Sequence, residues 1–454
     1  MKTKDFSRRK FIATTATGTA AVAVSASIPA FGNITPVRNE SEKLAILGGT
    51  PVAPEKKWPD WPYIDEKVVE EVVKTTRSGI WCRIQSPNGT VPTFEKELAK
   101  LYGIKNTVST GSGTQALNTV VEALELGPGD EIITSPYTDP GTIQSILVSR
   151  ALPVMADLDP ESFQLDPDDV ERKITKNTKA LMPVHMMGQP CNMQRIMEIA
   201  KKNNLKVIED SCQAIMAVYQ GKKVGLIGDA GCLSFQTSKV FCCGEGGAIF
   251  SNNDELLEKC YTVMNHGTAK NGRTTVIGSK YRMNEFEAAV LLGQMPGLQE
   301  RHDIRNRNAK YITENLKDIP GLIPQKLYEG TTEGSWYIYA WAYKKEQWNN
   351  APREKFLKAL AAEGISLSPY IANGLHREPW TEFIQTLPEY KTMFGAARMK
   401  KFRDELNLVK CDQVCQEMAM IWASGPLTGT LADMDDLIKA IKKVHANRDK
   451  LNSI

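Results

Sequence analysis

The sequence lacks the features that define several protein classes. Its 454 residues include nine cysteines without a Cys-x-x-Cys pair and only five histidines, which disfavours a disulfide scaffold or a metal site. The formal net charge is only +3, and residues 1–30 contribute +4 of it, so the remainder stands at −1. Nucleic-acid binding needs an excess of Lys and Arg, so we expect no nucleic acid as a partner.

What the sequence does contain is typical of a globular protein. Hydrophobic residues make up 42% and charged residues 24%, and the length suggests two or three domains. Composition and pattern predict a leader over 1–30, an arm on the surface over 31–63, a large domain over 64–300 and a small C-terminal domain over 301–454.

The first thirty residues indicate an export signal. Arg8 and Arg9 precede Phe11 and a mildly apolar run with small residues near Ala26 and Ala30. This order is typical of a signal peptide, and the adjacent arginines indicate the twin-arginine route of bacteria. A membrane anchor is the alternative, but the run contains too many Thr and Ser residues to be a good span. We therefore expect export to the periplasm by the twin-arginine machinery, with a membrane tether if the leader stays uncleaved.

Short apolar strands alternate with helices between residues 64 and 300. The pattern predicts strands over 107–109, 131–135, 153–157, 180–184, 206–210, 231–235 and 248–251, and helices over 66–76, 92–102, 113–125, 141–149 and 193–203. Such alternation predicts an α/β fold with a mostly parallel sheet covered on both faces. A long polar helix over 301–316 then leads into a smaller α+β region, which ends in a helix near 434–447.

The segment Gly111-Ser-Gly-Thr-Gln-Ala116 follows a predicted strand and opens a predicted helix. Backbone N–H groups at a helix start bind phosphate, although a glycine-rich turn without a ligand is an alternative. The segment also fits the Gly-x-Gly-x-x-Ala dinucleotide fingerprint, which requires an acidic residue about 20 positions later at a strand end. Glu131 has that spacing but stands at the start of its strand, so a nicotinamide dehydrogenase is disfavoured.

Two further motifs place an acid and a lysine at strand ends. Asp210 closes the strand 206–210, where a carboxylate can hold a ring nitrogen protonated, although aspartate is also a common helix cap. Lys239 follows the strand 231–235 in a largely uncharged stretch, so it is a candidate nucleophile, although most lysines are solvated surface residues. A phosphate site, an acid and a lysine in that order are what pyridoxal 5′-phosphate needs.

With these motifs in place, the chain resembles a known family. STGSGTQAL (109–117), VIEDSCQA (207–214), VGLIGDAGCLSFQTSK (224–239) and KYRMNEFEAAVLLGQM (280–295) are similar to motifs of the DegT/DnrJ/EryC1/StrS sugar aminotransferases. The resemblance spans roughly residues 44–447, and the opening LAILGGTPV is similar to scyllo-inosose aminotransferases. It implies the type I pyridoxal phosphate (aspartate aminotransferase) fold, with a large cofactor-binding domain, a smaller α+β domain, and a homodimer with a shared active site.

The resemblance also implies roles for individual residues. Lys239 would form the Schiff base with pyridoxal phosphate and act as the catalytic base, Asp210 would pair with the ring nitrogen, and Gln213 would lie near the ring. Phosphate contacts are implied for Gly113, Thr114, Gln115, Ser234 and Lys280. The family supplies an Asn from the neighbouring subunit where Lys280 stands here.

Other positions depart from the family or are weaker candidates. Asp139 stands where the family has an aromatic residue that stacks on the cofactor, and strand alternation predicts that nearby Tyr137 points elsewhere. His185 is implied to lie near the cofactor, and Arg282 and His376 are candidate substrate contacts.

The activity implied by the resemblance is ping-pong transamination. Glutamate or glutamine would donate the amino group, and a keto-sugar or an inosose-like keto-cyclitol would accept it. Nucleotide-linked sugars are cytoplasmic, so the predicted export favours a free or glycosidic acceptor. The alternatives are a pyridoxal phosphate-dependent dehydratase or lyase on a related sugar, and an exported non-catalytic binding protein on the same scaffold.

Overall fold

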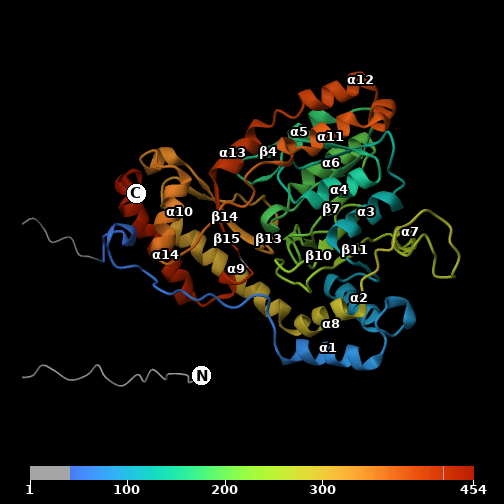
Figure 1. Ribbon diagram of the computed structural model, residues 1–454, viewed down its shortest axis with the longest axis horizontal. Helices are drawn as coiled ribbons and strands as arrows, with labels where there is room; N and C mark the ends of the chain where they lie inside the picture. Colours follow the sequence, from blue (N-terminus) through green and yellow to red (C-terminus); the bar gives the residue numbers. More distant parts are fainter. Residues whose placement is uncertain (1–40, 423) are drawn as a thin grey trace, which may run out of the picture. The chain divides into compact units, whose positions relative to one another are not determined.

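A seven-stranded sheet forms the centre of the larger part of the protein (Figure 1). The computed structural model describes residues 41–422 and 424–454, so the predicted leader and the start of the arm lie outside the described residues. The strands are β1 (Val108–Thr110), β2 (Glu131–Thr134), β3 (Leu152–Met155), β6 (Thr178–Met182), β7 (Lys206–Asp210), β10 (Ala230–Ser234) and β11 (Gly247–Phe250). All seven overlap the strands predicted from the sequence, and β7 has the predicted bounds.

The strand order is β1-β11-β10-β7-β6-β2-β3. The pairs from β10 to β3 are parallel, whereas β11 is antiparallel to both of its neighbours. The mostly parallel α/β architecture predicted from the sequence is therefore confirmed. Because the parallel strands run the same way, their carboxyl ends lie at one edge of the sheet, where ligands bind in such folds.

Helices cover both faces of this sheet, because alternate strand residues point to opposite sides. Ile132, Met182 and Ile208 pack with α3 (Gly113–Ala123) and α7 (Asp254–Met264). Their neighbours Ile133, Leu181 and Val207 pack in another core. The second core includes buried residues of α2 (Thr90–Tyr102), α4 (Pro140–Val148), α5 (Pro167–Lys173), α6 (Met193–Asn203) and α8 (Glu285–Gln294). Helix α1 (Glu66–Ser78) lies against α8.

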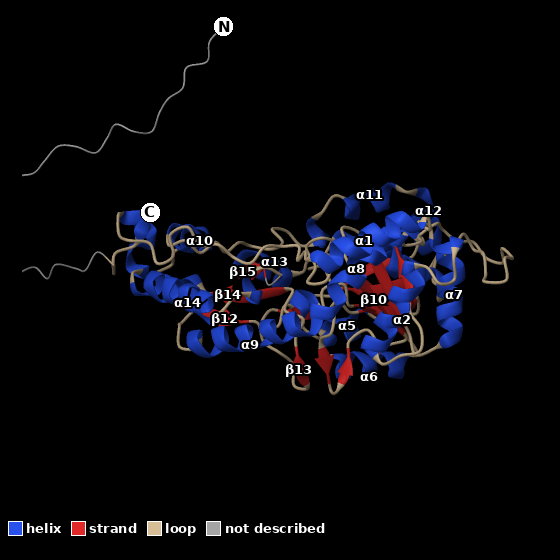
Figure 2. Ribbon diagram, turned by 90° about the horizontal axis from the view of Figure 1, so that it is seen from below, coloured by secondary structure: helices blue, strands red, loops and turns tan. Residues whose placement is uncertain are grey.

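A second, antiparallel sheet lies in the C-terminal part, with the order β12-β14-β15 (Figure 2). Its strands are β12 (Leu322–Pro324), β14 (Ile338–Tyr343) and β15 (Met418–Trp422). It packs with α9 (Leu298–Leu316), α10 (Arg353–Ala362) and α14 (Leu431–Ala446) around a core rich in aromatic residues. The predicted polar helix, the α+β region and the final helix are all found here. A small sheet of β8 (Val218–Tyr219), β9 (Lys222–Lys223) and β13 (Thr331–Glu333) joins the two parts.

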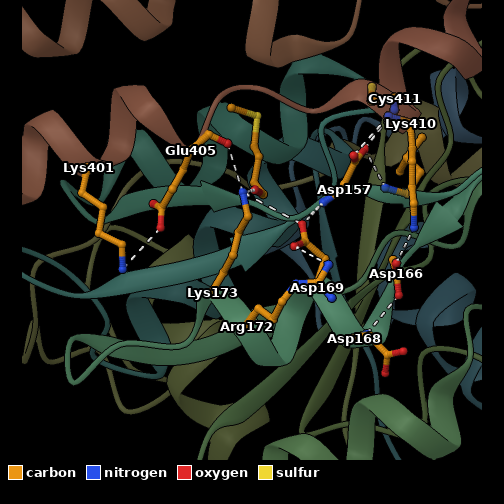
Figure 3. A network of polar contacts seen from close by, with 12 residues as sticks. Asp157, Asp166, Asp168, Asp169, Arg172, Lys173, Lys401, Glu405, Lys410 and Cys411 are labelled. Atoms are coloured by element: carbon orange, nitrogen blue, oxygen red, sulfur yellow. Dashed lines mark hydrogen bonds and ion pairs between the residues drawn. The ribbon is translucent and has the colours of Figure 1, made fainter.

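The chain returns to the large sheet between β14 and β15. This stretch contains α11 (Trp380–Thr386), α12 (Pro388–Asp404) and α13 (Val409–Glu417), whose apolar residues belong to the core of the large sheet. Asp157 accepts hydrogen bonds from the N–H groups of Lys410 and Cys411 and so caps α13, as Figure 3 shows. In the same network, Lys173 Nζ donates to the carbonyls of Met155 and Glu405. Segments on either side of residue 300 therefore share one core.

The described part of the predicted arm is fastened to the C-terminal part. Leu44 and Ala53 are buried among its core residues, so the arm is not confined to the surface. Lys56 pairs with Asp433 at 2.5 Å and Asp436 at 2.8 Å. Further along the arm, Trp61 Nε1 donates to the carbonyl of Thr237 at 2.9 Å, two residues before Lys239. Within residues 41–422 and 424–454, we find no helix that is both long and apolar enough to cross a membrane.

Candidate active site

A cavity of about 440 Å³ lies where β7 and β10 end and α3 and α4 begin. Its volume falls within the usual range for small-molecule sites. The sheet side contributes Ser112, Gly113, Thr114, Asp139, Thr142, Asp210, Cys212, Ser234 and Lys239. The C-terminal part contributes Tyr337, Tyr370 and Trp422. The cavity is therefore built from segments that are far apart in the sequence.

The start of α3 presents unpaired backbone donors to this cavity. Ser112 is the N-cap, and its side chain accepts a hydrogen bond from the N–H of Gln115 at 3.1 Å. The N–H groups of Gly113 and Thr114 find no acceptor among the described residues. Free N–H groups at the positive end of a helix favour a bound anion such as phosphate.

Gly113 has no room for a side chain. A Cβ there would stand 2.7 Å from Ser234 Cβ and 2.9 Å from Cys212 Sγ, both closer than van der Waals contact allows. The glycine therefore lets the helix start approach the ends of β7 and β10. A ligand phosphate at this point would lie close to the backbone.

Asp210 presents a buried carboxylate to the cavity. Its side chain is 3% exposed, with Oδ2 accepting from Thr142 Oγ1 at 2.7 Å and Oδ1 accepting from the N–H of Cys212 at 3.2 Å. A carboxylate oxygen can accept more than one hydrogen bond, so Asp210 keeps capacity for a cationic partner in the cavity. The two donors fix its orientation. Burial raises the pKa of the neighbouring Cys212 thiol well above its usual value, so this thiol stays protonated.

The preceding residue, Glu209, points to the other side of β7 and is fully buried. Its carboxylate accepts from the N–H groups of Gly225, Ile227 and Gly228 and lies 3.0 Å from His185 Nε2. Because His185 Nδ1 accepts from the N–H of Cys191, the ring proton is assigned to Nε2, which donates to Glu209. His185 therefore supports the strand behind Asp210 and does not line the cavity.

Lys239 lies in a tight turn after β10, and its side chain is half-buried. Its Nζ stands 4.3 Å from the ring centroid of Tyr337, a cation–π distance. The Tyr337 hydroxyl is 2.8 Å from Ser238 Oγ, which ties the ring to the lysine turn. Lys239 makes no ion pair with any carboxylate that the structure describes. Its amine is therefore available to a ligand in the cavity.

Tyr337 reaches the cavity because two backbone segments touch. The N–H of Ser335 donates to the carbonyl of Gly188 at 2.8 Å, and a Cβ on Gly188 would stand within 3 Å of the N atoms of Trp336 and Tyr337. The φ angle of Gly188 is +83°, which glycine adopts without strain. The segment 183–190 (PVHMMGQP), which contains Gly188, thus brings β14 to the edge of the large sheet.

Three aromatic rings form the wall opposite the large sheet. Tyr337 and Tyr370 both pack edge-on against Trp422, with centroids 5.2 and 5.7 Å away. Gln213 Nε2 donates to the Tyr370 hydroxyl at 3.1 Å. Burial raises the pKa of Tyr370 well above its usual value, and nearby Asp139 adds to this effect, so the phenol stays neutral.

The structure gathers most of the predicted site residues in this cavity. Gly113, Thr114, Asp210, Ser234 and Lys239 line it. Gln213 lies beside it and orients Tyr370, whereas the N–H of Gln115 is engaged by Ser112. Lys280 is exposed and does not line the cavity of its own chain. Its role stays a prediction.

The weaker candidates lie elsewhere. His376 is buried with Nε2 3.0 Å from Asp412, and Arg282 donates to Asn265, so neither lines the cavity. Tyr137 is fully buried against Tyr370. Asp139 lines the cavity as the N-cap of α4, accepting from the N–H of Gly141 at 2.8 Å.

Several cavity residues were not predicted from the sequence. Thr142 lies at the start of α4, the helix that follows β2, and β2 is separated from β7 by β6 alone. This position near the carboxyl ends of the strands could have suggested Thr142 as a site residue. Tyr337, Tyr370 and Trp422 carry no motif and come from the C-terminal part. Their contribution depends on tertiary contacts.

The dinucleotide alternative finds no support in the position of Glu131. This carboxylate is fully buried at the start of β2, where Arg398 and Thr175 donate to it. It therefore lies at the opposite end of the strands from the cavity. Among the described residues, no cluster of three or more His, Cys, Asp or Glu side chains could hold a metal ion.

The cavity residues fit pyridoxal phosphate. The free N–H groups of α3 suit its phosphate, the buried Asp210 carboxylate suits a protonated ring nitrogen, and the unpaired Lys239 amine suits its aldehyde. The fold and this set of residues define a pyridoxal phosphate-dependent aminotransferase.

Comparisons with known proteins agree. The sequence profile of the DegT/DnrJ/EryC1/StrS aminotransferase family matches residues 62–417, and the chain belongs to that family. An L-glutamine:2-deoxy-scyllo-inosose aminotransferase from Streptoalloteichus tenebrarius is 31% identical over 90% of this chain and 99% of its own length.

Solved structures share the fold. The 3-amino-5-hydroxybenzoic acid (AHBA) synthase superposes with a TM-score of 0.75 at 24% identity, over 86% of this chain and 99% of that one. Bacillus subtilis NtdA, solved with bound cofactor PMP, superposes with a TM-score of 0.70 at 26% identity, over 86% of both chains. The type I fold and the cofactor class implied by the sequence resemblance are therefore confirmed.

Proposed function

We propose that the protein transfers an amino group from glutamine or glutamate to a keto-sugar or a keto-cyclitol. The observation that carries this proposal is the single cavity that combines Lys239, Asp210 and the free N–H groups of Gly113 and Thr114. The relative from Streptoalloteichus tenebrarius, whose name specifies L-glutamine and 2-deoxy-scyllo-inosose, supports the donor and the class of acceptor.

The roles of the residues follow from their positions. Bound pyridoxal phosphate supplies an electron sink for the carbon that loses its proton. Lys239 Nζ moves that proton, since it is the only Lys, Arg or His side chain that lines the described cavity. Asp210, held by Thr142, stabilises positive charge on the ring nitrogen. Gly113 and Thr114 bind the phosphate through their N–H groups.

The visible spectrum of the purified protein tests the cofactor roles. We expect a yellow protein that loses its colour on borohydride reduction. Reduction attaches the cofactor covalently as a label, and peptide mapping should locate this label on Lys239. The Lys239→Arg variant is the matched control and should bind cofactor without being labelled. A wild-type protein that stays unlabelled in excess pyridoxal phosphate would contradict an active site at Lys239.

Isotope transfer tests the reaction itself. With L-glutamine carrying ¹⁵N at its α-amino group and a scyllo-inosose as acceptor, we expect the label in the aminated cyclitol. A dehydratase or lyase would transform the sugar without taking up the label, and a binding protein would do neither. Either result would replace the transaminase proposal.

We further propose a homodimer with shared sites, in which Lys280 supplies a cation to the neighbouring subunit's phosphate site. The exposed position of Lys280, outside its own cavity, supports this proposal. Subunits carrying Lys239→Ala and Lys280→Ala, each inactive alone, should regain activity when dissociated and mixed. Random pairing restores roughly a quarter of the sites. Lack of recovery, or a monomer by sedimentation, would argue against sharing.

Export by the twin-arginine route is proposed from Arg8 and Arg9, which lie outside the described residues. Cell fractionation should find the protein in the periplasm, or at the membrane if the leader is retained. Replacing both arginines by lysine should leave it in the cytoplasm. The proposal fails if the variant and the natural sequence distribute alike.

A further inference from the structure

A second cavity of about 560 Å³ adjoins the active site. Asp139 and Tyr370 line both cavities, so the two spaces meet at these side chains. The rest of its wall comes from the start of α4 and from residues 371–380, including Ile371, Pro379 and Trp380.

Its walls combine an indole with carboxylates. Trp380 is half-buried, and its Nε1 donates to the carbonyl of Leu375 at 2.8 Å, which holds the ring at the cavity edge. Glu378 and Asp139 offer carboxylate oxygens, and among the contacts of the described residues only Oδ1 of Asp139 is engaged, by the N–H of Gly141. Indole faces pack against the C–H faces of sugar rings, and carboxylates accept hydrogen bonds from hydroxyl groups.

The charge of this cavity discriminates between ligands. Asp139 and Glu378 are both acidic, and among its described lining residues there is no Lys, Arg or His. Recognition of phosphate requires cationic or N–H donors, and two carboxylates would repel a diphosphate. The cavity therefore suits a neutral ring.

We propose that the acceptor is a neutral keto-glycoside whose reacting ring occupies the active-site cavity and whose anomeric substituent lies against Trp380. This inference rests on the proposed transamination and specifies its acceptor. A sugar linked to a nucleoside diphosphate is excluded as the preferred acceptor, because its charged linker would meet Asp139 and Glu378.

Binding of unreactive ligands tests the second cavity without relying on catalysis. Methyl β-glucoside and cellobiose are suitable probes, because their equatorial hydroxyls match those of a scyllo-inosose. By calorimetry, with indole fluorescence as a second readout, cellobiose should bind about tenfold more tightly than methyl β-glucoside. This ratio is what one aromatic contact contributes.

Two variants separate stacking from folding. Trp380→Ala should abolish the tenfold preference and leave methyl β-glucoside binding unchanged, whereas Trp380→Phe should retain part of it. Ala372→Trp, at an exposed position that lines only the second cavity, should fill the space and weaken cellobiose alone. Equal binding of both sugars by the wild type, or a preference that survives Trp380→Ala and Ala372→Trp, would overturn the proposal.

Acceptor kinetics then distinguish this proposal from the function on which it rests. The corresponding sugars oxidised at ring carbon 3 or 4, and a nucleotide-linked keto-sugar, are compared as acceptors. Amino transfer with equal kcat/KM for short and long glycosides, or the highest kcat/KM for the nucleotide sugar, would contradict the proposed role of the second cavity. The transaminase proposal would stand. Cellobiose binding that depends on Trp380, without any amino transfer, would contradict the proposed transamination but not the role of the second cavity in sugar binding.

Discussion

The two walls of the active-site cavity are built in different ways. On the sheet side, Asp210 is held by Thr142 and a backbone N–H, and Gly113 is wedged against Ser234. On the opposite side, Tyr337, Tyr370 and Trp422 meet edge to edge and are anchored by two hydroxyl contacts. A polar wall whose side chains are fixed by hydrogen bonds and close packing suits the binding of the cofactor, whereas an aromatic wall suits the choice of substrate.

The largest effect should be on folding stability, from a substitution at Glu209, which lies behind the sheet wall and outside the cavity. Glu209→Gln removes a buried carboxylate that accepts from His185 and three backbone N–H groups. We expect a loss of about 3–5 kcal/mol in unfolding free energy, because the amide NH2 group of Gln cannot accept and leaves two of the four buried donors unpaired, at about 1–3 kcal/mol each. Urea unfolding measures it. A loss below 1 kcal/mol would mean that the hydrogen bonds of Glu209 contribute little to the stability of the folded protein.

Asp210→Asn should affect chemistry more than stability. The amide cannot stabilise a protonated ring nitrogen, so we expect kcat to fall about 10²- to 10³-fold, as when one preorganised electrostatic partner is lost. Thr142→Val is the matched control, because it keeps the carboxylate and removes one donor, and about a tenfold fall is expected. Steady-state kinetics with glutamine checks both. Equal effects of the two variants would contradict a specific role for the charge.

Gly113→Ala should weaken cofactor binding. The added Cβ would overlap Ser234 and Cys212, and such overpacking costs about 1–3 kcal/mol. The dissociation constant for pyridoxal phosphate, titrated by absorbance, should rise about tenfold or more. Gly79→Ala adds a Cβ that would meet nothing within 4 Å, and its φ of +68° strains only the end of α1, outside the cavity, so the affinity should be unchanged. Identical affinities for the two variants would show that the close packing of Gly113 against Ser234 does not affect phosphate binding.

Changes to the aromatic wall should be smaller. Tyr337→Leu removes the ring beside Lys239 Nζ and the contact with Ser238, so we expect about a tenfold loss in kcat/KM. Tyr337→Phe keeps the ring and should lose only a few-fold. Acceptor KM should change more than cofactor affinity in both cases. A fall in cofactor affinity instead would contradict the assignment of cofactor binding to the sheet wall and acceptor binding to the aromatic wall.

The smallest effect concerns pH. Burial lowers the pKa of His302, His376 and His445 below the ordinary value of about 6.5. The unfolded chain then binds more protons than the folded one below that pH, so the histidine contribution to stability is complete above about pH 6.5 and declines as the pH falls. Urea unfolding at pH 7.5 and 5.5 should show this decline, and His376→Gln should reduce it. A stability that rises on acidification would contradict the prediction.

The sequence predicted the sheet wall far better than the aromatic wall. The α/β pattern, the motif around Gly113, and the strand ends at Asp210 and Ser234 are local signals, since short apolar runs and helix starts are set by near neighbours. The antiparallel direction of β11 was not predicted, because strand direction depends on which partner a strand finds. Tyr370 and Trp422 reach the cavity only through packing between segments that are far apart in the sequence.

The arm links the first described residues to the last helix of the chain. Lys56 pairs with Asp433 and Asp436, the N–H group of Ala53 bonds to the carbonyl of Glu363, and Trp61 rests on the carbonyl of Thr237 beside the lysine turn. Glu363, Asp433 and Asp436 stand more than 300 residues after their partners in the arm. During synthesis the arm can therefore dock on Glu363 and α14 only after those segments have left the ribosome. A ribosome-bound chain that lacks α14 contains all seven strands of the large sheet but lacks both carboxylates that pair with Lys56.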